Sequence, residues 1–191
     1  MLNIVLFGPP GAGKGTQSER LIEKFNLTHI STGDLFRKHL SEGTELGKLA
    51  QKFMDDGYLV PDEVVIGMVE DRIKQDDVVN GIIFDGFPRT VNQAEALDNL
   101  LQKNGEHISG MIALEVPHDE LKKRLHARGK ISGRADDQNE EKINNRIEVY
   151  LRETLPVSEF YRNQDKFYAV NGVGSIDSIF NSIVETIENL S

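Results

Sequence analysis

A glycine-rich loop that contains a lysine carries the clearest chemical signal in the chain. The loop reads GPPGAGKGT over residues 8–16; it follows an apolar run, residues 2–7, and precedes a segment with helical spacing, residues 17–25. Glycines let backbone N–H groups turn inward around an anion, and the following helix adds the positive end of its dipole. Lys14 adds a full positive charge for the outer phosphates. A merely flexible turn would need neither the lysine nor this context, so the loop predicts binding of a nucleoside triphosphate.

The loop departs from the general phosphate-binding pattern at one position. Gly15 directly follows Lys14, and the hydroxyl residue, Thr16, comes one position later than usual. The sequence therefore leaves open whether Thr16 coordinates magnesium directly. The predicted phosphate binding is unaffected, because it depends on the backbone N–H groups and the lysine.

A second polar cluster follows an apolar run that ends in Asp85. An acidic residue at this place typically faces the phosphate loop and holds magnesium, here through water, although Asp85 could instead cap a helix or a loop. Gly86 and Pro88 predict a sharp turn that aims Arg89 into the same crevice, where a guanidinium can grip phosphate oxygens with two hydrogen bonds. Gln93, one helical turn further on, could offer its amide to the edge of a nucleobase.

Residues 31–60 are predicted to form a small helical flap over that crevice. Two helical stretches, about 32–40 and 44–56, follow each other without a strand between them. Arg37 lies near the start of the first; alone it would be an ordinary surface arginine, but with Arg89 it could clamp a second phosphate. Residues 57–61 are predicted to be an apolar, hairpin-like stretch suited to covering a flat base.

Four arginines gather in the last third of the chain. Arg124 and Arg128 are four residues apart and therefore share one helix face. Arg134 belongs to residues 129–137, which are predicted to be an exposed polar loop, and Arg146 lies on the next helix. Such a group could be a solvated helical surface. Because the loop faces two predicted phosphate sites, we interpret it as a cage around a transferring phosphoryl group.

Composition narrows the class of protein. A chain of 191 residues is expected to form one compact domain with small insertions. Its net charge of −9 argues against a surface built to bind nucleic acid. The absence of cysteine excludes disulfides and thiolate metal sites. No apolar run is long enough to cross a membrane and no leader pattern is present, so we expect a cytoplasmic protein that does not bind membranes.

The pattern of apolar runs predicts an α/β fold with a parallel sheet covered by helices on both faces. Ligands of such sheets bind beyond the carboxyl ends of the strands, so the residues after Phe7, Ile30 and Phe84 should converge on one crevice. The predicted strands are residues 2–7, 28–30, 81–85, 111–116 and 167–170, and the helices between and after them are residues 17–25, 62–74, 91–102, 118–128, 139–161 and 176–190.

Five segments together give the chain a specific resemblance. In order they are GPPGAGKGTQ, ISTGDLFR, GYLVPDEV, FDGFPRTVNQAEAL and RG(x)₄GRxDD. Over essentially its whole length the chain resembles adenylate kinases, in the nucleoside monophosphate kinase family. The resemblance implies a three-layer, P-loop NTPase-like fold with a five-stranded sheet. It also implies a core of residues 1–30, 61–126 and 138–191, a flap for the monophosphate at 31–60 and a short lid at 127–137. Because the chain has no cysteine, the zinc-binding version of the lid is excluded.

The resemblance also implies roles for individual residues. Phosphoryl transfer would depend on Lys14, Arg89, Arg128, Arg134 and Arg146, and Asp85 would hold Mg²⁺ through water. ATP would be bound by Gly11, Ala12, Gly13, Lys14, Gly15, Thr16, Arg124, Arg128 and Gly174. AMP would be bound by Thr32, Arg37, Tyr58, Leu59, Val60, Gly86, Phe87, Pro88, Arg89, Gln93, Arg134 and Arg146.

The implied reaction is the reversible, magnesium-dependent transfer of a phosphoryl group from ATP to AMP, which gives two ADP and balances the adenine nucleotides. A monomer is expected to carry it out. The acceptor is a phosphate with a second pKa of about 6, so no general base is needed. A kinase for UMP or CMP remains an alternative, as does a catalytically silent nucleotide-binding module. A kinase of the shikimate type should lack the DGFPRT and GYLVP segments.

Overall fold

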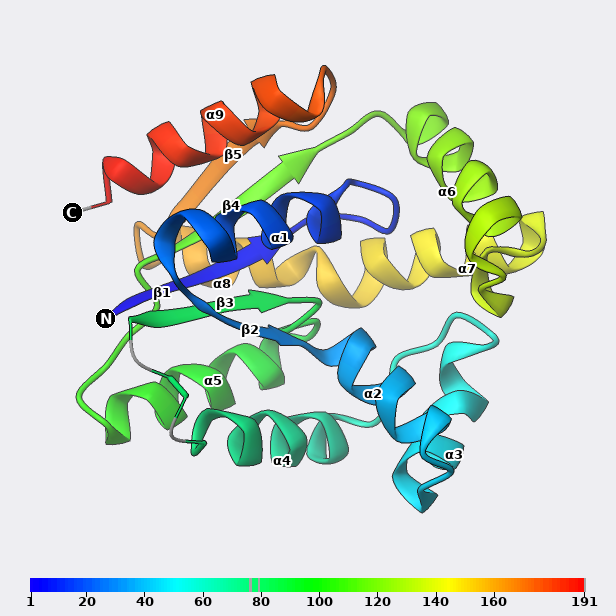
Figure 1. Ribbon diagram of the computed structural model, residues 1–191, viewed down its shortest axis with the longest axis horizontal. Coiled ribbons are helices and arrows are strands. Elements are labelled where there is room, and N and C mark those ends of the chain that lie inside the picture. Colours follow the sequence, from blue (N-terminus) through cyan, green and yellow to red (C-terminus); the bar gives the residue numbers. More distant parts are fainter. Residues whose placement is uncertain (76, 79, 191) are drawn as a thin grey trace.

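The sheet of the protein has five parallel strands, as the sequence predicts. A computed structural model describes residues 1–75, 77–78 and 80–190. The strands lie in the order β2-β3-β1-β4-β5, and every neighbouring pair is parallel (Figure 1). The strands are β1 (Leu2–Phe7), β2 (Thr28–Ser31), β3 (Gly81–Asp85), β4 (Gly110–Glu115) and β5 (Phe167–Asn171).

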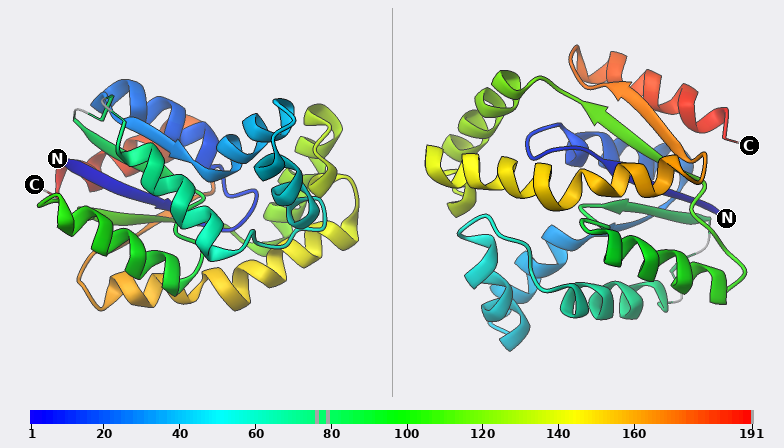
Figure 2. Two further views of the ribbon diagram at one scale, coloured as in Figure 1. Left: turned by 90° about the horizontal axis from the view of Figure 1, so that it is seen from below. Right: turned by 180° about the vertical axis from the view of Figure 1, so that it is seen from behind.

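Helices cover both faces of this sheet because the side chains of each strand alternate between them. In β1, Val5 and Phe7 belong to one apolar core with α4, α5 and α8, whereas Ile4 and Leu6 belong to another with α1 and α9. Figure 2 shows the three layers that result. The bounds of these helices are α1 (Lys14–Phe25), α4 (Asp62–Ile73), α5 (Val91–Lys103), α8 (Pro156–Arg162) and α9 (Ile176–Glu188).

The register of the strands brings three loops to one edge of the sheet. Leu6 of β1 and Ser31 of β2 both pair with Asp85 of β3, so these strands end at nearly the same level. The glycine-rich loop, the start of α2 and the turn after β3 therefore meet beyond this edge. This confirms the sequence-based expectation that the residues after Phe7, Ile30 and Phe84 converge.

Two helical insertions extend past this edge on opposite sides of the glycine-rich loop (Figure 1). One contains α2 (Thr32–Ser41) and α3 (Glu45–Met54); a Cβ on Gly47 would lie 2.4 Å from the backbone of α2, so only glycine permits this close packing. The other contains α6 (His118–Ser132), a 3₁₀ turn (Ala135–Asp137) and α7 (Glu140–Val149).

Three local predictions are wrong. The predicted loop 129–137 is mostly helical, because α6 continues to Ser132 and ends at Gly133, whose φ of 64° lies in the left-handed region that favours glycine. The predicted helix 139–161 is interrupted by a π-helical segment at Tyr150–Thr154, since Pro156 has no N–H to continue the regular ladder. Residues 57–61 form a turn at Gly57 and then an irregular connection rather than a hairpin.

Both ends of the described fold lie on the side of the molecule away from these insertions. Leu2 begins β1 there, and α9, which runs back along the sheet, ends there at Glu188 (Figures 1 and 2). None of the helices in the described ranges is both long enough and apolar enough to cross a membrane.

Candidate active site

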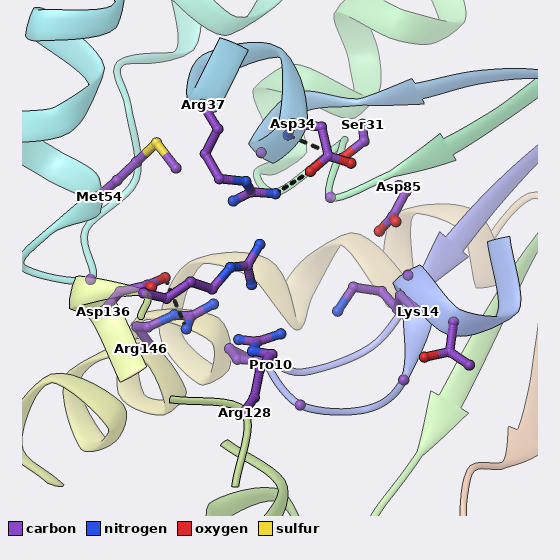
Figure 3. Close-up of a pocket in the computed structure, with 18 of the residues that line it drawn as sticks. Pro10, Lys14, Ser31, Asp34, Arg37, Met54, Asp85, Arg128, Asp136 and Arg146 are labelled. Carbon is purple, nitrogen blue, oxygen red and sulfur yellow. Dashed lines mark hydrogen bonds and ion pairs between the residues drawn. The ribbon is translucent and has the colours of Figure 1, made fainter. Parts of the chain in front are cut away.

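A cavity of about 520 Å³ lies between the two insertions, beyond the carboxyl ends of the strands. Four carboxylates, from Glu19, Asp34, Asp85 and Asp136, line it together with seven cationic side chains. Figure 3 shows four of these cations, Lys14, Arg37, Arg128 and Arg146, converging on the space in the middle. In a protein with a net charge of −9, this local excess of positive charge favours an anionic ligand. The cations are Lys14, Arg37, Arg89, Arg124, Arg128, Arg134 and Arg146.

The glycine-rich loop is held in a conformation that depends on its glycines. Gly13 has a φ of 97° directly before α1, and a Cβ on Gly11 would lie 3.0 Å from Leu125 of α6. The Lys14 ammonium bends back and donates to the carbonyls of Gly8 (2.8 Å) and Pro9 (3.1 Å). Burial, together with the neighbouring arginines and against the opposing effect of Asp85, lowers the pKa of Lys14 to about 8.

Asp85 faces this loop from the end of β3. Its carboxylate accepts a hydrogen bond from Ser18 Oγ at 3.3 Å and lies 3.6 Å from the ring of His29. Burial alone would raise the pKa of Asp85, but His29 and Lys14 outweigh it, so the net shift is downward. A carboxylate beside a phosphate loop, in the same cavity as the hydroxyl residue Thr16, fits Mg²⁺, which takes few protein ligands and several from phosphate and water.

Arg89 is fixed by the turn that follows β3. Its Nε donates to the Gly86 carbonyl at 2.7 Å, and its backbone N–H donates to Gln93 Oε1 at 2.8 Å. Burial lowers the pKa of Arg89 to about 10, and the nearby Arg146 adds to this effect. Arg37 reaches toward the cavity from α2 and pairs with Asp34 (Figure 3). Arg37 and Arg89 therefore line the end of the cavity formed by α2 and the β3 turn.

A buried carboxylate organises the arginines of the other insertion. The side chain of Asp137 has no exposed surface and forms ion pairs with both Arg128 and Arg146. Arg146 also lies 2.9 Å from Asp136. Burial lowers the pKa of Arg146 and of Arg134, although both guanidinium groups remain charged at neutral pH. The ion pairs with Asp137 therefore hold Arg128 of α6 and Arg146 of α7 at the cavity even when no phosphate is bound.

The structure brings most of the sequence-predicted site residues together. Besides its seven cations, the main cavity is lined by Gly11, Gly13, Gly15, Thr16, Tyr58, Asp85 and Gly86. A smaller cavity of about 40 Å³ adjoins it and is lined by Thr32, Leu59, Val60 and Gln93, among others. Phe87 and Pro88 line a third space of about 70 Å³ behind Lys14. Ala12, which is buried in the core, and Gly174, which precedes α9, line none of the three.

Sequence reasoning missed the acidic partners of the site. Asp136 and Asp137 were part of a predicted exposed loop, yet Asp137 is buried and joins two of the predicted catalytic arginines. The available signal was the pair of aspartates after Arg134 in a segment rich in arginine. Asp62 was also missed, although it contacts Gln93.

Comparison with known proteins agrees with this geometry. The family model described as adenylate kinase matches residues 6–166. The chain belongs to the adenylate kinase family. It is 54% identical to the adenylate kinases of Flavobacterium psychrophilum and Flavobacterium johnsoniae over 190 residues, which cover 100% of each chain. It is 46% identical to the adenylate kinase of Leptospira biflexa over 187 residues, which are 98% of this chain and 100% of that one.

Family membership confirms the predicted class of enzyme. The chain is a nucleoside monophosphate kinase with a P-loop, and neither its fold nor its relatives favour a UMP or CMP kinase or a silent binding module. Its substrates are accordingly nucleotides. Within the described residues, no group of three or more histidines and carboxylates could hold a metal ion by itself, and the chain has no cysteine.

Proposed function

We propose that the cavity catalyses the reversible, magnesium-dependent transfer of a phosphoryl group from ATP to AMP, which yields two ADP. The observation that carries this proposal is the distribution of cations in a single cavity. Lys14 and its loop lie beside Arg89 of the β3 turn, Arg37 reaches in from α2, and Arg128 and Arg146 converge on the same space from α6 and α7. Two anionic substrates could therefore meet between them.

The proposed donor site is the glycine-rich loop with its helix. Residues 11–16 would cradle the ATP phosphates, and Arg124 and Arg128 would lie along them. Arg124 donates to the carbonyl of Ala12 in the loop at 3.4 Å and to the carbonyl of Gly172 at 3.0 Å, so it bridges the loop and the segment after β5. We expect Gly174, in that segment, to contact the adenine through its backbone.

The proposed acceptor site lies between α2, α3 and the turn after β3. Arg37 and Arg89 would bind the AMP phosphate, and the smaller cavity beside them would accept the base. That cavity is lined by the apolar residues Leu59 and Val60 and by the Gln93 amide. An amide can pair with adenine by donating and accepting at the same time, and AMP is the acceptor that the resemblance to adenylate kinases implies. Thr32, Tyr58 and residues 86–88 complete the proposed acceptor site.

Catalysis in this proposal depends on position and charge. An oxygen of the acceptor phosphate attacks the terminal phosphorus of the donor, and the ADP oxygen leaves in line with it. Lys14, Arg89, Arg128, Arg134 and Arg146 stabilise the charge spread over the transferring group. The acceptor is already anionic, so Asp85 is not needed as a base. When bound at Asp85 through water, Mg²⁺ would neutralise charge on the outer phosphates.

The first insertion and the middle part of the second are proposed to close over the nucleotides. Residues 31–60 and residues 127–137 would act as a flap and a short lid on a core of residues 1–30, 61–126 and 138–191. Closure would exclude water, which otherwise competes with AMP for the phosphoryl group. We expect a monomer that acts on the free nucleotides of the cytoplasm.

The proposal is tested by replacing the loop lysine. ADP formation from ATP is measured with AMP, UMP and CMP as acceptors, in the unaltered protein and in the Lys14→Ala and Lys24→Ala variants. Lys24 lies on the same helix but is exposed and faces Glu188. We expect AMP to be the preferred acceptor, Lys14→Ala to lower kcat by about a thousandfold, and Lys24→Ala to change it little. Near-normal turnover by Lys14→Ala, or a preference for UMP, would contradict the proposal.

A further inference from the structure

The carboxylate of Asp62, the first residue of α4, receives three side-chain hydrogen bonds from the start of α5. Its Oδ1 accepts from Thr90 Oγ1 at 3.1 Å and from Gln93 Nε2 at 2.8 Å, and its Oδ2 accepts from Asn92 Nδ2 at 3.0 Å. These bonds tie the segment that follows residues 57–61 to the helix that carries Gln93. Asp62 lies outside the linings of the three cavities, so it acts on a ligand only through its partners.

The amide of Gln93 is held at both of its ends. Nε2 donates to Asp62, and Oε1 accepts from the backbone N–H of Arg89 at 2.8 Å. The side chain is buried, with an exposed fraction of 1% for the residue. A backbone N–H can only donate and a carboxylate can only accept, so a single orientation of the amide satisfies both neighbours. If the amide rotated by 180°, the Gln93 oxygen would face the Asp62 carboxylate and its NH₂ group would face the backbone N–H of Arg89.

The locked amide still has capacity for a ligand. A glutamine amide has two N–H groups and two lone pairs, and the contacts with Asp62 and Arg89 use one of each. The remaining N–H and lone pair belong to a side chain that lines the smaller cavity. Adenine carries an amino group beside a ring nitrogen that accepts, whereas hypoxanthine carries a carbonyl beside a ring N–H. A freely turning amide could suit either edge, but a fixed one suits only one of them.

We propose that Asp62 is a positioning residue that sets the choice between purines in the acceptor site, by fixing the orientation of the Gln93 amide. The inference rests on the proposed function of the smaller cavity as the site of the AMP base. It adds that discrimination between adenine and hypoxanthine depends on a carboxylate that does not itself contact the nucleotide.

The test compares kcat/KM for AMP with kcat/KM for inosine monophosphate. In Asp62→Ala, the Gln93 amide loses the carboxylate that holds it in one orientation. We therefore expect the preference for AMP over inosine monophosphate to fall about tenfold, while KM for ATP stays the same. Asp62→Asn should keep most of the preference, because its Oδ1 can still accept from Gln93 and the exposed Asn92 can turn its own amide. Asn92→Ala is the matched control, since it removes a partner of Asp62 but leaves the Gln93 bond, and it should not change the preference.

A second comparison separates positioning from a general loss of structure. In a Gln93→Met background, Asp62→Ala should no longer change the ratio of the two kcat/KM values, because the side chain through which it acts is gone. Asp62→Ser, which is too short to reach Gln93, should match Asp62→Ala and serves if the alanine variant does not fold. The inference would be overturned, and the proposed function left standing, by either of two results. One is an unchanged ratio in both Asp62→Ala and Asp62→Ser. The other is a change in the Gln93→Met background as large as the change in the unaltered background. Failure of the unaltered protein to phosphorylate AMP would overturn the proposed function and the inference with it.

Discussion

The Lys14 ammonium occupies a place where positive charge is costly without a ligand. Among the described residues, its hydrogen bonds go to two carbonyls of its own loop, and Arg89, Arg128 and Arg146 repel it. Burial and this repulsion lower the pKa of Lys14 to about 8, well below the usual value of a lysine. A bound triphosphate would favour the charged form and raise the pKa again. A bound phosphate would relieve this repulsion, so the free enzyme has an electrostatic driving force for phosphate binding.

This pKa predicts a pH dependence at the donor site. As the pH rises through about 8, the free enzyme loses the Lys14 charge, so kcat/KM for ATP at saturating AMP should fall. The fall in kcat itself should come at higher pH, because bound phosphates hold the proton on Lys14. Initial rates measured between about pH 6.5 and 9.5 check both profiles. Lys24→Ala should show the same profile, and a kcat/KM for ATP that stays flat across this range would contradict the assignment.

At the scale of helices, the end of α3 rests on the helix that carries Arg146. Asn145 donates to the carbonyl of Asp56, and a Cβ on Gly57 would lie 2.6 Å from Arg146 Cγ. Lys142 lies 3.7 Å from the Asp56 carboxylate. The two insertions therefore touch at a point where only glycine fits. We expect this contact to let closure of residues 31–60 set the position of Arg146.

A comparison of Gly57 with Gly43 distinguishes the effect of this contact from the effect of backbone strain. Gly57 has a φ of 78° and Gly43, in the same insertion, has a φ of 67°, but a Cβ on Gly43 would meet nothing within 4 Å. Alanine at either position should cost about 1 kcal/mol of unfolding free energy. Only Gly57→Ala should also raise KM for AMP, by about tenfold, because it holds the insertion away from α7. Denaturant unfolding and steady-state kinetics measure the two effects; an equal rise in KM in both variants would show that strain alone is responsible.

At the scale of the molecule, an acidic protein keeps an excess of cations around one cavity. A bisubstrate mimic, two adenosines joined by five phosphates, should neutralise them and bind only the folded state. At a hundred times its Kd it should stabilise the protein by about 2.7 kcal/mol. For a chain of this size the melting temperature should then rise by about 5–10 °C. Scanning calorimetry at a fixed concentration of the mimic measures the rise, which should be much smaller in Lys14→Ala; an equal rise would place the phosphates elsewhere.

Much of this architecture could be predicted because it depends on local patterns. The apolar strands and the glycine-rich loop are legible within a few residues, and the parallel sheet then follows from their alternation with helices. The π-helical segment before Pro156 and the continuation of α6 to Ser132 were not predicted, because the apolar spacing alone does not show how a helix is interrupted or where it ends. The roles of Asp62 and Asp137 were not predicted either. Each owes its importance to partners on other helices or turns, and a single sequence does not show such neighbours.

The position of the chain ends has a practical meaning. Leu2 and Glu188 lie at the amino edge of the sheet, on the opposite side of the molecule from the glycine-rich loop and both insertions (Figures 1 and 2). An affinity tag, a fluorescent fusion or a surface anchor attached at either end would leave the mouth of the cavity open. The same placement makes the enzyme suitable for tethering to a bead or an electrode while nucleotides diffuse in and out unhindered.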